Sequence, residues 1–146
     1  MGYYHPPRHD MQRFREVLRG AIRGEKLAIA YYPCIAQMAP DPTAREMIDH
    51  VIEDEMEHLE AFSDLYHSLY RQDPDVLLDY VPEFDTYEEG LRIAFADELE
   101  AAEFYRDVMF NWTQMGTPAN RVFHWAMLDE MEHMSVFAFL LADASH

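Results

Sequence analysis

Apolar residues recur along most of this chain at alternating intervals of three and four positions. The pattern is clearest in four segments, which cover residues 18–36, 48–69, 91–112 and 123–140. This spacing is typical of helices that bury one side against their neighbours. It predicts an all-α protein in which four long helices pack as a single bundle.

Acidic and imidazole side chains interrupt each apolar stripe at matched positions. The segment Asp-Glu-Met-Glu-His occurs at residues 54–58 and again at residues 129–133. A lone glutamate precedes the first glutamate of each copy: Glu25 by 30 residues and Glu98 by 32 residues. A Glu and a His three residues apart lie on the same side of a helix. The predicted metal ligands are therefore Glu25, Glu55, His58, Glu98, Glu130 and His133.

The position of these acids on the buried stripes is costly unless something compensates their charge. An uncompensated buried carboxylate costs several kcal/mol, and four would rival the total stability of a small domain. The stripes contain no Lys or Arg to pair with them. They must be protonated, paired or bound to metal, and two metal ions are the simplest explanation. A purely structural bundle with paired acids is the alternative, but it leaves the two matched copies unexplained.

Breaks between the apolar segments indicate how the helices connect. Asp41 and Pro42 predict the cap and first turn of the second helix, and Asp85 with Glu88 predicts a capping box for the third. About fourteen residues, 72–85, separate the second and third helices, and they reach at most about 46–50 Å when extended. This is just enough to travel the length of the bundle, which predicts an up-down-down-up topology. A domain-swapped dimer that exchanges hairpins satisfies the same pattern.

Composition narrows the class of protein further. The 146 residues suffice for one domain, which we place at residues 11–146 after an irregular N-terminal arm, residues 1–10. A net charge of −17 disfavours nucleic acid and membrane surfaces as partners. The single cysteine, Cys34, excludes an internal disulfide and a Cys-x-x-Cys site. The sequence shows no N-terminal signal peptide and no apolar run of about 18 residues, so we expect a cytoplasmic protein.

The mixture of ligand types indicates which metals the site prefers. Carboxylates with imidazoles suit Fe(II) or Mn(II), whereas the lack of thiolates argues against structural zinc and Cu(I). Asp54 and Asp129 precede the paired ligands, where they can accept a hydrogen bond from the opposite imidazole or simply face solvent. Tyr32 and Tyr105 lie seven residues after the lone glutamates, where they either hydrogen-bond a ligand carboxylate or pack in the core.

Two short motifs resemble a known family. Residues 24–29 (Gly-Glu-Lys-Leu-Ala-Ile) followed by Tyr32, and residues 54–58, are similar to bacterioferritin and also fit rubrerythrins. The resemblance to these ferritin-like di-iron carboxylate proteins covers about residues 11–143 and implies a ferritin-like four-helix bundle. It also implies that each half of the chain binds one iron, with Glu55 and Glu130 bridging both. The implied ligand sets are Glu25, Glu55 and His58 for one iron, and Glu98, Glu130 and His133 for the other.

The chain departs from these families at several points. Met56 and Met131 stand where bacterioferritins carry a haem-ligating Met, but Met is a common core side chain and haem is not expected. Ala101 replaces a further carboxylate of rubrerythrins, which calls into question the iron movement associated with their peroxidase activity. We find neither a Cys-rich rubredoxin domain nor the fifth helix that helps to close ferritin cages.

The resemblance implies a di-iron oxidoreductase that reduces hydrogen peroxide or O2 with electrons from an external donor. A non-catalytic iron-binding or storage module and a manganese catalase-like site are the alternatives. An exposed apolar helix face would make a homodimer or higher homo-oligomer.

Overall fold

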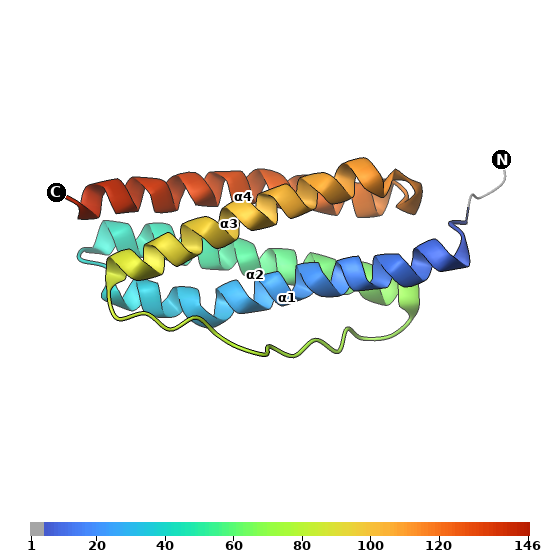
Figure 1. The fold of residues 1–146 in the computed structure, drawn as a ribbon, viewed down its shortest axis with the longest axis horizontal. Helices are drawn as coiled ribbons and strands as arrows, with labels where there is room; N and C mark the ends of the chain where they lie inside the picture. Colours follow the sequence, from blue (N-terminus) through green and yellow to red (C-terminus); the bar gives the residue numbers. More distant parts are fainter. Residues whose placement is uncertain (1–4) are drawn as a thin grey trace.

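The computed structural model describes residues 5–146 and shows four long helices packed side by side (Figure 1). The part of the chain that it describes contains no strand, so the predicted all-α four-helix bundle is confirmed. The elements are α1 (Arg8–Met38), α2 (Pro42–Tyr70), α3 (Tyr87–Asn111), a short 3-10 helix η1 (Thr113–Met115) and α4 (Thr117–Ala144).

The helices follow the predicted up-down-down-up order. Short links make antiparallel hairpins of α1 with α2 and of α3 with α4, whereas α2 and α3 run in the same direction (Figure 1). The connection between the hairpins, residues 71–86, travels the length of the bundle along its outside. One chain thus supplies all four helices, and the two hairpins are related by an approximate two-fold axis.

The long connection is fixed to the outside of α1 near the middle of the bundle. Val76 is buried, and its carbonyl oxygen accepts a hydrogen bond of 2.8 Å from the Lys26 ammonium group. Farther along, Phe84 packs edge-on against the ring of Tyr31. These contacts hold the crossover beside the helix that carries Glu25.

The observed helix ends confirm one predicted cap and differ from the prediction at two other positions. The Asp41 carboxylate accepts a hydrogen bond from the Ala44 amide, which confirms that cap. The capping box of α3 uses Thr86 and Glu89, one residue later than predicted, because the Thr86 hydroxyl accepts a hydrogen bond from the Glu89 amide and the Glu89 carboxylate accepts one from the Thr86 amide. Helix α1 already begins at Arg8, so the last three residues of the expected arm are helical, and residues 1–4 lie outside the described part.

Two apolar clusters fill the bundle on either side of a polar centre. One is built around Phe14, Phe62 and Phe123, and the other around Ile35 and Phe137. In two helices the buried side differs by one residue from the predicted one. Ala28 and Ala102 are buried, whereas the predicted Ile29 and Ala101 are half-buried. The difference follows from a helical repeat of 3.6 rather than 3.5 residues per turn. None of the described helices has the length and hydropathy of a membrane span.

Two helical glycines provide a matched test of the packing. A Cβ atom at Gly90 would lie 2.8 Å from Phe84 Cε2 and 3.0 Å from Ile35 Cγ1, whereas one at Gly24 would meet no atom within 4 Å. We expect Gly90→Ala to lower the free energy of unfolding by about 1–2 kcal/mol through overpacking. Gly24→Ala should raise it by about 0.5–1 kcal/mol, because alanine favours the helix. Urea unfolding of the metal-free variants measures both, and equal changes of the same sign would contradict this account.

Candidate metal centre

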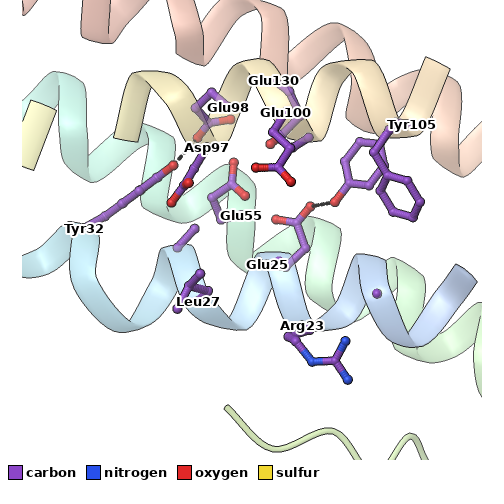
Figure 2. A pocket seen from close by; sticks show the side chains of 15 residues that line it. Arg23, Glu25, Leu27, Tyr32, Glu55, Asp97, Glu98, Glu100, Tyr105 and Glu130 are labelled. Carbon is purple, nitrogen blue, oxygen red and sulfur yellow. Dashed lines mark hydrogen bonds between the residues drawn. The ribbon is translucent and has the colours of Figure 1, made fainter. Parts of the chain in front are cut away.

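The six predicted ligands meet at the centre of the bundle, between the two apolar clusters. Helices α1 and α3 each contribute one glutamate, and α2 and α4 each contribute a glutamate and a histidine. All six residues are between 0% and 2% exposed. Figure 2 shows the carboxylates of Glu25, Glu55, Glu98 and Glu130 directed toward one another from four different helices. The helical spacing therefore brings the predicted set together.

The ligand atoms form two groups that share two members. The first consists of Glu25, Glu55, His58 and Glu130, and the second of Glu55, Glu98, Glu130 and His133. Within each group, one ligand atom from every residue lies within 4.8 Å of all the others. Since Glu55 and Glu130 belong to both groups, they occupy the position of ligands that bridge two ions.

The buried polar atoms of this centre are directed at common points rather than at one another. Each of the six residues has one buried oxygen or nitrogen with no hydrogen-bond partner among the described residues. His133 Nδ1 lies 2.7 Å from Glu55 Oε1, and His58 Nδ1 lies 3.1 Å from Glu130 Oε1, yet neither pair has hydrogen-bond geometry. Buried polar atoms are rarely left in this condition without a ligand. Four carboxylates and two imidazoles are thus compatible with a di-iron site.

Hydrogen bonds across the bundle fix both imidazoles. His58 Nε2 lies 2.8 Å from Asp129 Oδ2, and His133 Nε2 lies 2.8 Å from Asp54 Oδ2. Each aspartate therefore contacts the histidine of the opposite hairpin and leaves the Nδ1 atom of that ring facing the centre. Such a carboxylate partner sets the tautomer and orientation of a metal-binding histidine.

Two buried tyrosines hold the lone glutamates in the same crossed manner. The Tyr32 hydroxyl donates a hydrogen bond of 2.6 Å to Glu98, and the Tyr105 hydroxyl donates one of 2.5 Å to Glu25 (Figure 2). Burial, together with the charge of the neighbouring glutamates, raises the pKa of both hydroxyls well above the usual value. They therefore remain protonated donors that orient the carboxylates.

Burial also changes the protonation of the centre itself. It raises the pKa of Glu55 and Glu130 well above the usual range, and the charges of Glu25 and Glu98 add to this effect. Burial alone would lower the pKa of His58, but the Glu25 carboxylate, 3.6 Å from His58 Nδ1, and the charge of Glu55 outweigh this and raise it to about 9. Without metal the centre therefore retains protons, which bound cations must displace.

A pocket of about 260 Å³ leads to the carboxylates between α1 and α3. It reaches all four glutamates but neither histidine. Small residues on the facing helices, among them Gly20, Gly24 and Ala101, leave this space open. Arg23 also lines it, although Figure 2 shows its guanidinium directed away from the carboxylates. The pocket gives small molecules a path to the side of the centre opposite the imidazoles.

The structure adds contacts that sequence reasoning missed. The Tyr31 hydroxyl donates a hydrogen bond of 2.5 Å to Asp97, which lines the pocket and precedes Glu98 as Asp54 precedes Glu55. The repeated Asp-Glu pair in the sequence could have indicated that Asp97 lies beside the centre. Trp125 stands edge-on against His58, with ring centroids 4.7 Å apart. No motif indicated this contact.

The two methionines of the repeated motif and the cysteine lie away from the centre. Met56 and Met131 are exposed on the surface rather than filling the core. Cys34 is also exposed.

Metal stoichiometry tests the shared ligands. We expect Glu55→Gln to abolish binding of both ions, because Glu55 belongs to both ligand groups. Glu25→Gln should leave one ion bound, since Glu25 belongs to the first group alone. Calorimetric titration with anaerobic Fe(II) measures the number of ions bound. The exposed Glu57→Gln in the same helix is the matched control, and two ions bound to the Glu55 variant would contradict the assignment.

Stability of the metal-free protein should fall as pH rises. The pKa values of Glu55 and Glu130 lie above their unfolded values, so this stabilisation is complete below about pH 4.5 and is lost as pH rises through the folded values. His58 acts in the same direction, with stabilisation lost as pH rises from about 6.5 through about 9. Thermal melting in a chelator should therefore give a lower Tm at pH 9 than at pH 6. Glu55→Gln should flatten this dependence, and a Tm that rises with pH would refute it.

Comparison with known proteins agrees with this geometry. A search of solved structures finds a hypothetical protein from Pyrococcus furiosus with the same fold, at a TM-score of 0.74 and 21% identity, covering 94% of this chain and 95% of that one. An uncharacterized Bacillus subtilis (strain 168) protein, YhjR, is 32% identical over 139 residues, which is 94% of this chain and 92% of that protein. The sequence model of the rubrerythrin family matches residues 16–141. This chain therefore belongs to the rubrerythrin family, within the ferritin-like di-iron superfamily.

Proposed function

We propose that this protein is a di-iron oxidoreductase that reduces hydrogen peroxide or O2 and is returned to its reduced state by an external electron donor. The observation that carries the proposal is the pair of overlapping ligand groups, which lie fully buried at the inner end of a pocket. A buried redox centre with an open approach on one side is suited to reaction with a small oxidant.

The charge and composition of the centre suit a pair of divalent cations such as Fe(II). The four glutamates carry four negative charges when ionised, and two divalent cations offset all four. Carboxylates can change between terminal and bridging binding, and their charge stabilises the higher oxidation state after electrons leave. Bound iron would supply the two electrons that reduce the oxidant.

The side chains around the centre have separate tasks in this proposal. Glu55 and Glu130 hold the two ions as a pair, and Tyr32 and Tyr105 hold the lone glutamates in position. The crossed aspartates direct the imidazole Nδ1 atoms inward. The apolar clusters at both ends exclude bulk water, so that the pocket between α1 and α3 is the proposed path of the oxidant.

One feature separates this centre from the rubrerythrin pattern. Ala101 lies on the pocket wall where rubrerythrins place a further carboxylate, and this widens the approach instead of adding a ligand. The proposed reaction therefore relies on the six buried ligands alone. A storage module and a manganese catalase-like site remain the competing functions, and the following experiment distinguishes all three.

Reoxidation of the reduced protein tests the proposal directly. Anaerobic protein loaded with two Fe(II) is mixed in separate experiments with hydrogen peroxide and with O2, and the absorbance of the oxidised centre is followed. We expect at least one oxidant to react faster than it does with free Fe(II) at the same concentration. Iron binding without faster reoxidation would indicate storage. Vigorous release of O2 from peroxide by the manganese-loaded protein alone would indicate a catalase-like centre.

The same measurement on pocket variants identifies the path of the oxidant. Because a side chain at Gly24 enters open space, Gly24→Leu should fill the pocket without disturbing the fold. We expect it to slow reoxidation more than Gly24→Ala does, while both variants still bind two ions. Equal rates in both variants and the unaltered protein would place the path elsewhere.

A further inference from the structure

We propose that Trp125 is the point at which electrons from an external carrier enter the metal centre. This inference rests on the proposed function, because it identifies how that centre is reduced between turnovers. The observation behind it is the position of one indole between a predicted metal ligand and solvent.

Trp125 lies on α4 and meets His58 of α2 at right angles, with ring centroids 4.7 Å apart. The His58 side chain is fully buried, whereas Trp125 is 37% exposed. The two rings therefore form a continuous path of only two aromatic side chains from the protein surface to the inner ligand atom. Tyr32 and Tyr105 also contact predicted ligands, but both are 1% exposed and do not reach the surface.

The approximate two-fold symmetry of the site is broken at this position. The two Glu-x-x-His motifs are 75 residues apart (55 to 130), so the equivalent of Trp125 in the first hairpin is His50. His50 is exposed and lies 3.8 Å from Asp54. The ligands and the crossed aspartates are repeated in both halves, but the indole is present in one half alone. Such a difference is expected if electrons enter on one side of an otherwise symmetric centre.

Trp125 and the pocket approach the centre from different sides. The pocket opens between α1 and α3 and reaches no histidine, whereas Trp125 contacts the centre through His58 between α2 and α4. A carrier bound at Trp125 would therefore leave the path of the oxidant open. The separation also keeps the oxidant away from the carrier, which prevents a direct and wasteful reaction between them.

The surface around Trp125 indicates the chemistry of the carrier. Leu128, three residues along the same helix, is 53% exposed and provides apolar contact. The net charge of −17 favours encounter with a partner that is basic around its own redox group. We therefore assign the partner to one-electron carrier proteins with a basic rim. Each encounter oxidises the carrier by one electron and reduces one ferric ion to ferrous, so that two encounters restore the two electrons given to the oxidant.

Reduction kinetics of four proteins test this assignment. Protein loaded with iron and oxidised by ferricyanide is mixed anaerobically with reduced methyl viologen, a cationic one-electron donor. We expect the reduction rate to fall from the unaltered protein to Trp125→Phe, and further to Trp125→Leu. The fall to Trp125→Leu should be at least about tenfold, equivalent to about 1.4 kcal/mol of activation free energy. Trp112→Phe, at the other tryptophan, should reduce at the unaltered rate. Equal rates in all four proteins would overturn the proposal.

Two further readouts separate electron entry from a structural role. Reoxidation by the preferred oxidant and the number of bound ions should be the same in Trp125→Leu as in the unaltered protein, and parallel losses in all three would overturn the proposal. The chain has two tryptophans, so Trp112→Phe leaves Trp125 as its only indole emitter. Its fluorescence should be quenched by metal loading more strongly than that of Trp125→Phe, and equal quenching would count against the contact.

These measurements also distinguish this inference from the proposed function. Reduction of ferricyanide-oxidised protein requires neither peroxide nor O2. A Trp125-dependent reduction with no reaction toward either oxidant would support electron entry and refute the proposed reaction. A fast reaction with an oxidant and no dependence on Trp125 would do the reverse.

Discussion

The burial of four glutamates at the centre of a small helical bundle is the constraint on which the rest of this structure depends. Carboxylates in an apolar core destabilise the folded protein unless protons, hydrogen bonds or cations compensate them. The protein uses protons and hydrogen bonds and has a site for cations. Tyrosines donate to Glu25 and Glu98, raised pKa values keep protons on Glu55 and Glu130, and unpaired ligand atoms converge where cations would bind.

Crossed contacts give this centre its rigidity. The aspartate beside each Glu-x-x-His motif binds the histidine of the opposite hairpin, and each tyrosine binds the glutamate of the opposite hairpin. The ligands of one half therefore have their orientation set by the other half. A small displacement of one hairpin would disturb both ligand groups at once, so that the centre forms only when the whole bundle is assembled.

Much of this arrangement follows from the sequence, because helical periodicity decides which side chains share a face. The four helices, their order and the convergence of residues such as Glu55 and His58 all derive from spacings of three, four and seven residues. Contacts between helices are less predictable, since they depend on rotation about each helix axis. That rotation determined that Trp125 meets His58, while the repeat of 3.6 residues per turn moved the buried position from Ile29 to Ala28. The pocket likewise depends on which small residues of α1 and α3 face each other.

The sharing of Glu55 and Glu130 has a consequence for the lifetime of the protein. Each ligand group takes three residues from one hairpin and its fourth, Glu55 or Glu130, from the other. Bound ions would thus add to the contacts between the two hairpins, which the long segment 71–86 alone joins covalently. A ligand that binds only the folded state raises the free energy of unfolding, and it does so more as its concentration exceeds its Kd. The supply of metal would then control not only how much of this protein is active but how long it escapes proteolysis.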